Sequence, residues 1–303
     1  MNLFSLAQKF PNEDAALLHL IKTRWPHGVR CLACDHDKCY LIETINKSRK
    51  PVKLFECSDC GLHFSATTNT LFHDTHLPLT KWFAVIALMV EAKKGISANQ
   101  VRRHVGLTYK TAWYVCHRVR EAMQEEKATK LGGDGFTVEI DETYVGGRKR
   151  GKGVKAAQRS KTVVVGMAER NGRIHLQTVK SSKTEDVHPV LASKLDRMTD
   201  TVVTDGANKY KSMFPKDRHV IGEHKRELRD KNWTSTQTVE NAFSLFKRGI
   251  VGNYHQLSAE HLDRYLGEFG WRYNRRRMQP WMFEMTLTNL VNKKPLPYKD
   301  LTF

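Results

Sequence analysis

The second half of the chain alternates short apolar runs with longer periodic segments, which predicts strands interleaved with helices. Residues 136–145 alternate apolar and polar side chains and predict a first strand. Residues 161–170 and 173–180 predict the two strands of a hairpin, joined by a tight primed turn at Asn171 and Gly172. Three antiparallel strands follow from this arrangement.

The same half continues with a second group of elements. Residues 184–198 have helical periodicity, and residues 201–204 form a short apolar strand. Residues 218–222 are a further strand candidate, and residues 238–250 predict an amphipathic helix. The apolar side of this helix carries Val239, Phe243 and Phe246. The order predicts a mixed α/β domain whose sheet is flanked by helices.

Helical patterns also fill residues 79–123, where Gly95 and Gly106 separate three segments. A short helix over residues 97–104, a turn and a longer helix from near Thr108 have the spacing of a helix-turn-helix. A plain helical bundle is the alternative, and the basic side chains favour DNA binding. The second helix would expose Lys110, Thr111, Tyr114 and Arg118. The DNA contacts assigned to this segment are Arg102, Arg103, Lys110, Thr111 and Arg118.

Composition adds a strong positive charge to this picture. The chain has 50 Lys and Arg against 32 Asp and Glu, a formal net charge of +18, which suits a polyanion such as double-stranded DNA. Basic residues cluster in 146–161, which holds no acid, and in 271–277 beside Trp271 and Tyr273. Such runs are also common on solvated faces. The further DNA contacts that we assign are Arg148, Lys149, Arg150, Lys152, Arg248, Arg275 and Arg276.

Three separated acids stand in settings that complement one another. Asp141 lies in the first strand, Asp205 directly follows a short strand, and Glu240 opens the last helix. Carboxylates from two neighbouring strands and a helix can converge, and Mg²⁺ or Mn²⁺ takes oxygen ligands. Lys247 lies two helical turns after Glu240 on the same face, where a cation could hold a DNA phosphate. Singly, each acid has a plain alternative as a solvent-facing, turn or first-turn residue.

Two CxxC pairs in the N-terminal quarter predict a structural Zn²⁺ site with four thiolate ligands. The predicted ligands are Cys31, Cys34, Cys57 and Cys60. Gly61 directly after the second pair supplies a permissive backbone. A disulfide framework is the weaker alternative, because the chain is large and shows no apolar leader. The nearby side chains that could compete as ligands are His36, Cys39 and His63.

The predicted order of elements matches the ribonuclease-H-like fold, in which the first and fourth strands lie side by side and present acids to the last helix. The chain resembles a DDE transposase of the bacterial insertion-sequence kind, of the ISXO-type group with an N-terminal zinc ribbon. The segments that carry the resemblance are EIDETYVGG, VVTDGANKY and VENAFSLFKRGIVGNYHQLSAEHLDRYLGEFGWRYNRR.

The resemblance implies catalytic roles for named residues. Asp141, Asp205 and Glu240 would bind the catalytic metal, with Asp141 bridging two ions, and Lys247 would be the helix lysine of the same motif. Many relatives have Asn three residues before the Glu, whereas Gln237 stands here. This departure favours Glu240 as the third ligand and leaves Gln237 as a helper candidate.

We expect three consecutive parts: a zinc ribbon with an N-terminal helix over 1–76, a helix-turn-helix-like segment over 77–132, and a catalytic domain over 133–303. No run is apolar enough to cross a membrane, and the expected location is the bacterial cytoplasm, at the nucleoid. The resemblance implies binding of terminal inverted repeats, DNA cleavage and strand transfer by at least a dimer. Two alternatives stay open: a DNA-binding regulator with a decayed catalytic domain, and a structure-specific nuclease.

Overall fold

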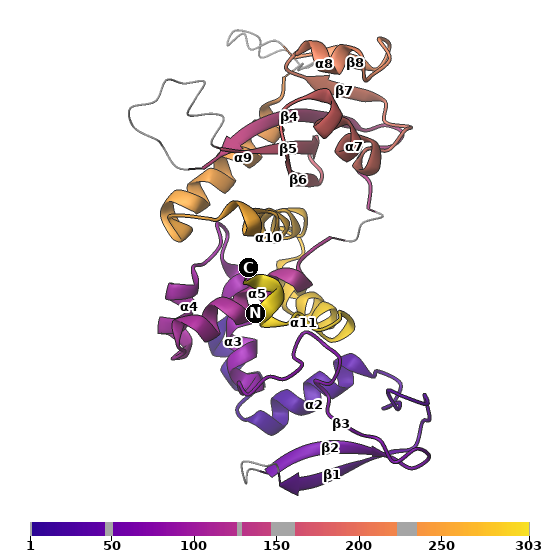
Figure 1. Cartoon of the computed structure of the whole chain (residues 1–303), viewed down its shortest axis with the longest axis vertical. Helices are drawn as coiled ribbons and strands as arrows, with labels where there is room; N and C mark the ends of the chain where they lie inside the picture. The colour runs from indigo at the N-terminus through magenta and orange to yellow at the C-terminus, as the bar shows by residue number, and fades with distance from the viewer. Residues whose placement is uncertain (1, 46–50, 126–128, 147–160, 223–234, 303) are drawn as a thin grey trace. The chain divides into compact units, whose positions relative to one another are not determined.

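The computed structural model describes residues 2–45, 51–125, 129–146, 161–222 and 235–302 (Figure 1). Contacts divide the chain into two compact units. The N-terminal unit comprises Met1–Ala92, Ala98–Met123 and Met278–Phe303, and the sheet unit comprises Lys93–Ser97 and Gln124–Arg277. The predicted DNA contacts at Arg148, Lys149, Arg150 and Lys152 lie outside the described residues.

The sheet unit is built on five strands in the order β6-β5-β4-β7-β8. Their bounds are β4 Thr137–Val145, β5 Thr162–Glu169, β6 Ile174–Val179, β7 Thr201–Thr204 and β8 His219–Ile221. β4 pairs antiparallel with β5 and parallel with β7, and β7 pairs parallel with β8. The first and fourth strands of the unit therefore lie side by side, and the predicted α/β class with a mixed sheet is confirmed.

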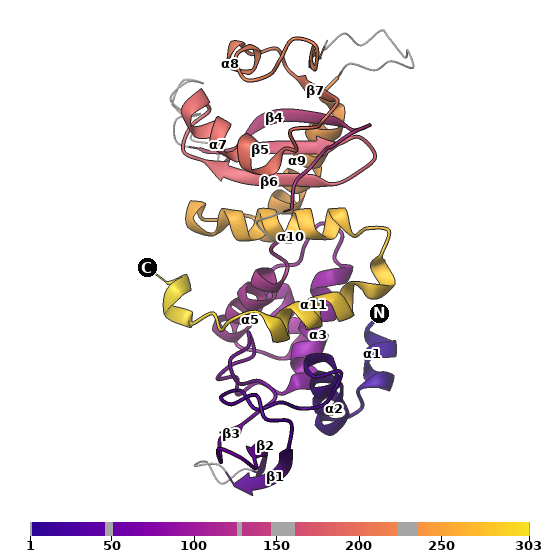
Figure 2. The same ribbon diagram turned by 90° about the vertical axis from the view of Figure 1, so that its right-hand side faces the viewer.

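Helices cover both faces of this sheet (Figure 2). The helices of the unit are α7 Thr184–Lys194, α8 Asn208–Lys211, α9 Gln237–Gly249 and α10 Leu262–Asn274, with a π-helix over Ile250–Tyr254 and a 3-10 turn over Ala259–His261. One apolar core joins the sheet to α9 and α10 through side chains such as Val164, Phe243 and Leu266. A second core joins the other face to α7 through Ile140, Val165 and Leu191.

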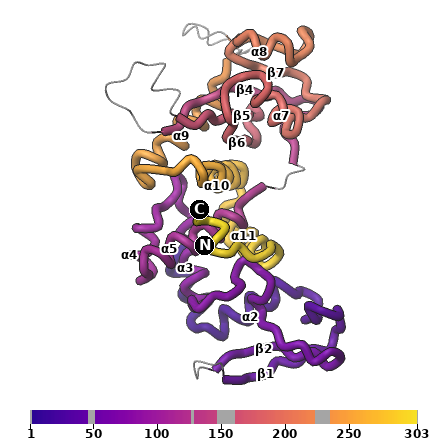
Figure 3. The backbone as a smooth tube through the Cα atoms, viewed as in Figure 1, coloured from indigo at the N-terminus to yellow at the C-terminus, as the bar shows by residue number. Residues whose placement is uncertain are grey.

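Alternation along β4 assigns its side chains to these two cores. Val138 and Ile140 belong to the α7 core, so Glu139 and Asp141 face α9 with Val145. The chain path from β4 to α9 and on into α10 can be followed in the tube of Figure 3. An alternating strand thus places Glu139 and Asp141 on the face that α9 covers.

The loop between β5 and β6 differs from the expected primed turn. Three residues separate Glu169 from Arg173. The backbone N–H of Glu169 donates a hydrogen bond to the carbonyl of Arg173 at 2.9 Å. Asn171 has φ +59°, whereas Gly172 does not have the positive φ that a two-residue type I′ turn also needs there. The hairpin was predicted correctly, but the turn type was wrong.

The N-terminal unit combines a small three-stranded sheet with helices. Its strands are β1 Cys39–Ile45, β2 Pro51–Cys57 and β3 His63–Phe64, in the order β1-β2-β3. Its helices are α1 Leu3–Lys9, α2 Glu13–Arg24, α3 Leu79–Glu91, α4 Ala98–Val105, α5 Tyr109–Ala122 and α11 Met282–Asn292, with 3-10 turns over Gln279–Trp281 and Tyr298–Leu301.

The C-terminal residues pack within this N-terminal unit. We expected residues 133–303 to form the catalytic domain, whereas Met278–Phe303 clusters with the N-terminal unit. These residues belong to the N-terminal unit because α11 packs on α2, α3 and α5. Phe283 and Leu290 on the apolar side of α11 are fully buried there. The division into 1–76, 77–132 and 133–303 stays a prediction about function. In the described ranges, no helix has both the length and the hydropathy needed to cross a bilayer.

Candidate active site and zinc centre

Asp141 and Glu240 line one open cavity in the sheet unit, of about 660 Å³. α9 supplies Glu240, Ser244 and Lys247, which recur at helical spacing and therefore share one side of the helix. β4 supplies Asp141 and Thr143, which are two residues apart and therefore share one face of the strand. The structure thus brings together two of the three predicted acids and the predicted lysine.

Asp205 directly follows β7, the strand that pairs with β4. β4 and β7 run parallel with Glu139 opposite Val203. Continued two residues beyond this last pair, the register would set Asp141 opposite Asp205, which directly follows the end of β7 at Thr204. The negative charge of Asp205 acts on the carboxyl of Asp141 and raises its pKa, so the two side chains are neighbours. Asp205 is exposed, and one of its carboxylate oxygens accepts a hydrogen bond from Ala207 N at 3.1 Å.

The three carboxylates do not form a tight cluster in this structure. In the part of the chain that the structure describes, the only group of three or more His, Cys, Asp or Glu ligand atoms lying within 4.8 Å of one another consists of cysteines. Asp141, Asp205 and Glu240 therefore surround a common region without converging on a single point. Their assignment as metal ligands stays a prediction.

The charges of the neighbouring acids affect the pKa of Asp141. The pKa of Asp141 is raised to about 7, chiefly by burial and then by the negative charges of Asp205, Glu142 and Glu240, while a hydrogen bond from Glu142 N opposes the rise. The three charge effects show that Asp141 has several acidic neighbours. Oxygen donors with unbalanced negative charge fit a hard divalent cation such as Mg²⁺.

Lys247 points back toward β4. Its Nζ donates a hydrogen bond to Thr143 Oγ1. Burial lowers the pKa of Lys247, and the charge of Lys161 lowers it further, whereas Asp141 raises it. Thr143 is 8% exposed and was not singled out from the sequence, although its position two residues after Asp141 on an alternating strand was a usable signal.

Gly166 permits the close approach of α9. It lies opposite Asp141 in the β4–β5 pairing. A Cβ atom at Gly166 would meet Phe243 Cζ at 2.5 Å and Val239 Cγ2 at 2.8 Å, which is closer than atoms in contact pack. The absence of a side chain therefore sets how near α9 comes to the strand that carries Asp141.

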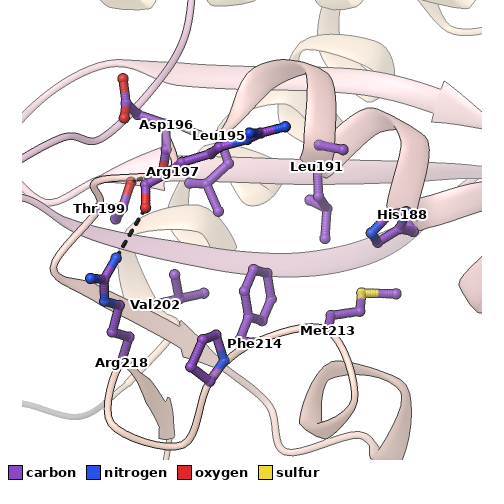
Figure 4. Close-up of a pocket in the computed structure, with 12 residues that line it drawn as sticks. His188, Leu191, Leu195, Asp196, Arg197, Thr199, Val202, Met213, Phe214 and Arg218 are labelled. Carbon is purple, nitrogen blue, oxygen red and sulfur yellow. Dashed lines mark hydrogen bonds between the residues drawn. The ribbon is translucent and has the colours of Figure 1, made fainter.

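A second cavity of the sheet unit, about 380 Å³ in volume, is separate from these acids (Figure 4). It lies among α7, β7 and the residues after α8, and Leu191, Val202 and Phe214 line it. Arg218 Nη1 donates to the carbonyl of Arg197 at 3.0 Å across its rim. None of the residues assigned to catalysis lines this cavity.

The four predicted zinc ligands form one cluster. The sulfurs of Cys31, Cys34, Cys57 and Cys60 all lie within 4.8 Å of one another. Asp35 and Gly61 follow the two CxxC pairs with φ +59° and +66°, so both pairs end in a left-handed residue. Donation from the backbone N–H groups of Cys34 and Ala33 lowers the pKa of Cys31 to about 6, which favours the thiolate that Zn²⁺ binds. His36, Cys39 and His63 are not members of the cluster.

The helix-turn-helix prediction matches α4 and α5. Gly106 has φ +65° in the turn between them, and the Thr108 side chain caps α5 by accepting from Thr111 N at 3.2 Å. Arg102, Arg103 and Lys110 are exposed, and Lys110 Nζ lies 4.8 Å from the centre of the Tyr298 ring.

The predicted exposure of Arg118 was wrong. Arg118 is 5% exposed, since its guanidinium donates to the carbonyl of His73 at 2.9 Å and to Tyr114 Oη at 2.5 Å. Tyr114, also expected to be exposed, is half-buried and donates to the carbonyl of Leu296 at 2.7 Å. Both side chains hold the N-terminal unit together, so we withdraw Arg118 as a DNA contact.

The remaining predicted DNA contacts differ in how exposed they are and in the groups they contact. Arg248 is exposed and lines the cavity that holds Asp141. Arg275 is half-buried, pairs with Glu125 and lies over Trp271, which is itself 1% exposed and part of the packing. Arg276 is exposed and donates to the carbonyl of Tyr273 at 2.7 Å.

The mixed sheet, with acids at the centre of β4, after β7 and on α9, has the strand order expected of a ribonuclease-H-like fold. The chain contains a DDE transposase domain of the ISXO2-like kind, preceded by a transposase zinc-ribbon domain. The model of the ISXO2-like transposase domain matches residues 130–274, and that of the transposase zinc-ribbon domain matches residues 11–63. The resemblance inferred from the sequence is therefore confirmed, and the zinc-ribbon match together with the four cysteines supports Zn²⁺ as a constituent.

A relative from Halobacterium salinarum agrees with this family. It is described as an uncharacterized protein in transposable element ISH50. The two chains are 26% identical over 282 residues, which cover 86% of this chain and 90% of the relative. The similarity thus extends across both compact units.

Proposed function

We propose that this transposase binds the terminal inverted repeats of an insertion sequence and carries out DNA cleavage and strand transfer at the cavity between β4 and α9. The observation that supports the proposal is that Asp141, Glu240 and Lys247 line one cavity, with Asp205 directly after the strand that pairs with β4. Acids and a cation together suit a phosphodiester substrate, because the first hold metal and the second holds phosphate.

Asp141, Asp205 and Glu240 would hold Mg²⁺ or Mn²⁺, which when bound activates the attacking oxygen and stabilises the leaving oxygen. The protein groups position the DNA. Lys247 has three N–H donors, so its Nζ can keep the hydrogen bond to Thr143 while it donates to a phosphate oxygen. Arg248 at the rim of the same cavity adds a second cation for the backbone.

Two reactions at this site account for transposition. In the first, water attacks the phosphorus at the element end and the bond to the 3′ oxygen breaks, leaving a 3′-hydroxyl. In the second, that hydroxyl attacks a target phosphodiester, forms a new P–O bond, and releases a target 3′-hydroxyl. Both displace an oxygen in line at phosphorus, so one arrangement of side chains serves both.

DNA-end recognition is assigned to the N-terminal unit. Arg102, Arg103, Lys110 and Thr111 belong to α4 and the start of α5, where the second helix of a helix-turn-helix enters the major groove. Association into at least a dimer is part of the proposal, because two element ends are joined in one event.

The test uses purified protein, Mg²⁺ and a labelled duplex that carries the element's inverted repeat. Wild-type protein is expected to give cut and joined strands. Asp141→Asn is expected to lower both products by about 10³-fold or more, the scale of losing a catalytic metal ligand, while it still binds the duplex. Asp196→Asn is the matched control, because Asp196 lies at the second cavity.

The outcomes separate the alternatives. Cut strands without joined strands would indicate a nuclease, and binding without any cutting under Mg²⁺ or Mn²⁺ would indicate a regulator. Cleavage that persists in Asp141→Asn would refute the proposed site.

A further inference from the structure

Glu139 is a buried carboxylate that the proposed chemistry does not use. It lies on β4 two residues before Asp141 and is 2% exposed. A buried charge is costly unless it is fully paired. Glu139 is paired mainly with α9, because its oxygens accept from Thr238 N at 2.6 Å, Thr238 Oγ1 at 2.8 Å and Val239 N at 3.2 Å.

These contacts complete the start of α9. The first N–H groups of a helix lack partners inside the helix and are usually satisfied by the side chain of the N-cap residue. Thr236 is the N-cap of α9 but makes no such bond, since its hydroxyl donates to Glu240 Oε1 at 2.7 Å. Glu139, from a strand about 100 positions earlier in the chain, takes over this capping role and adds a negative charge at the positive end of the helix.

Arg170 fixes the other side of this arrangement. It follows β5, and its Nε donates to Glu139 Oε1 at 3.1 Å. Its Nη2 donates to the carbonyl of Ser235 at 3.3 Å, directly before α9. The sheet therefore holds the first turn of α9 through two side chains that also hold each other.

The docking contact lies near both acids along the chain. On β4, Glu139 and Asp141 are two residues apart on one face. On α9, Thr238, which Glu139 binds, precedes Glu240 by two residues, within one helical turn but on a different side of the helix. A displacement of the Glu139 contact would therefore change the separation of Asp141 and Glu240.

We propose that Glu139 is a positioning residue, which docks the N-terminus of α9 on β4 and thereby sets the separation of Asp141 and Glu240 that metal binding needs. The inference rests on the proposed function for its catalytic consequence, and on contacts alone for the docking. Glu139 itself does not contact the cation or the DNA.

Glu139→Gln tests the proposal, because glutamine keeps the size but offers one acceptor oxygen where the structure uses two. Glu169→Gln is the matched control. Glu169 is also 2% exposed, pairs with Arg173 at 2.7 Å and accepts from Gly132 N at 2.9 Å, and its partners do not include α9. Both variants lose one buried, paired charge from the same sheet unit.

Two readouts separate positioning from general stability. In native hydrogen exchange, the first-turn amides of α9, at Thr238 and Val239, are expected to exchange about ten-fold faster in Glu139→Gln, the change that follows from weakening one charge-assisted hydrogen bond. In the cleavage assay, the Mg²⁺ concentration for half-maximal rate is expected to rise several-fold in Glu139→Gln, with unchanged DNA affinity and with recovery of rate at high Mg²⁺.

Glu169→Gln is expected to change neither readout. Equal exchange of the α9 amides in the two variants, or an equal Mg²⁺ requirement, would overturn the proposal. If the wild-type protein bound DNA but did not cut it, the proposed function would fail, and the exchange comparison would still decide whether Glu139 docks α9.

Discussion

At the scale of single residues, the site depends on alternation along one strand. β4 directs Glu139, Asp141 and Thr143 to one face, and each has a different partner: the start of α9, the neighbouring acids and Lys247. The sequence predicted Asp141 only in combination with Asp205 and Glu240, since each acid alone has a plain alternative. It did not predict the role of Glu139, because the partner lies about 100 residues away in the chain and no local pattern indicates which carboxylate caps a distant helix.

Gly166 gives a prediction at this scale. Gly166→Ala would place a Cβ 2.5 Å from Phe243 Cζ, so α9 has to move away from the sheet. We expect a loss of about 1–3 kcal/mol in the free energy of unfolding, the usual cost of overpacking a core, together with reduced cleavage. Urea denaturation measures the first effect, and the DNA assay measures the second.

Gly270→Ala is the control for this substitution. Gly270 is also buried, in α10, but a Cβ there would meet no heavy atom within 4 Å. This variant should be as stable as wild type or more stable, because alanine favours the helix. Equal stability of both alanine variants would contradict the close approach of α9 to β4.

At the scale of elements, the sequence pattern predicted which helices and strands form better than it predicted which of them pack together. The strands and helices of the sheet unit follow from short apolar runs and amphipathic periodicity. The packing of α11 with α2 and α3 could not be predicted from the sequence pattern. An apolar helix face shows that the helix packs against another element, but it does not identify that element. Arg118 was misjudged for the same reason, since its burial depends on the carbonyl of His73, 45 positions away in the chain.

Glu284 in α11 gives a prediction for the contacts among these helices. Burial alone raises its pKa, but hydrogen bonds from His19 in α2 and Lys9 in α1 outweigh that effect and lower the pKa to about 2. A carboxyl whose pKa is lower in the folded than in the unfolded chain, about 4.3 for glutamate, stabilises the fold above the unfolded value. That stabilisation is lost as the pH falls from about 4 toward 2.

Glu284→Gln should therefore be less stable than wild type at pH 6, and the difference should shrink and vanish as the pH approaches 2. Urea denaturation of both proteins across this range measures the difference in free energy of unfolding. Glu56→Gln in β2 controls for the loss of one charge, because the Glu56 side chain is 46% exposed and its contact with His63 is longer, at 3.6 Å. A difference that is constant with pH would show that the carboxylate is not what joins α11 to α1 and α2.

At the scale of the whole molecule, the chain joins a zinc ribbon and a helix-turn-helix-like pair to a ribonuclease-H-like sheet. The zinc-ribbon and transposase domains were predictable because the CxxC pairs and the three acidic segments are specific and widely separated. The bounds of the compact units were less predictable, since residues 278–303 pack with the N-terminal unit. Separate recognition and reaction parts would suit the proposed function, in which the protein holds a DNA end and cuts beside it.

The central claim is that Asp141, Asp205 and Glu240 form one cation site. The direct measurement is Mn²⁺ binding by electron paramagnetic resonance, with zinc-loaded protein and the inverted-repeat duplex present. We predict that bound Mn²⁺ is lost in Asp141→Asn and strongly reduced in Asp205→Asn and Glu240→Gln, but retained in Asp196→Asn. Unchanged Mn²⁺ binding in all three acid variants would contradict the account.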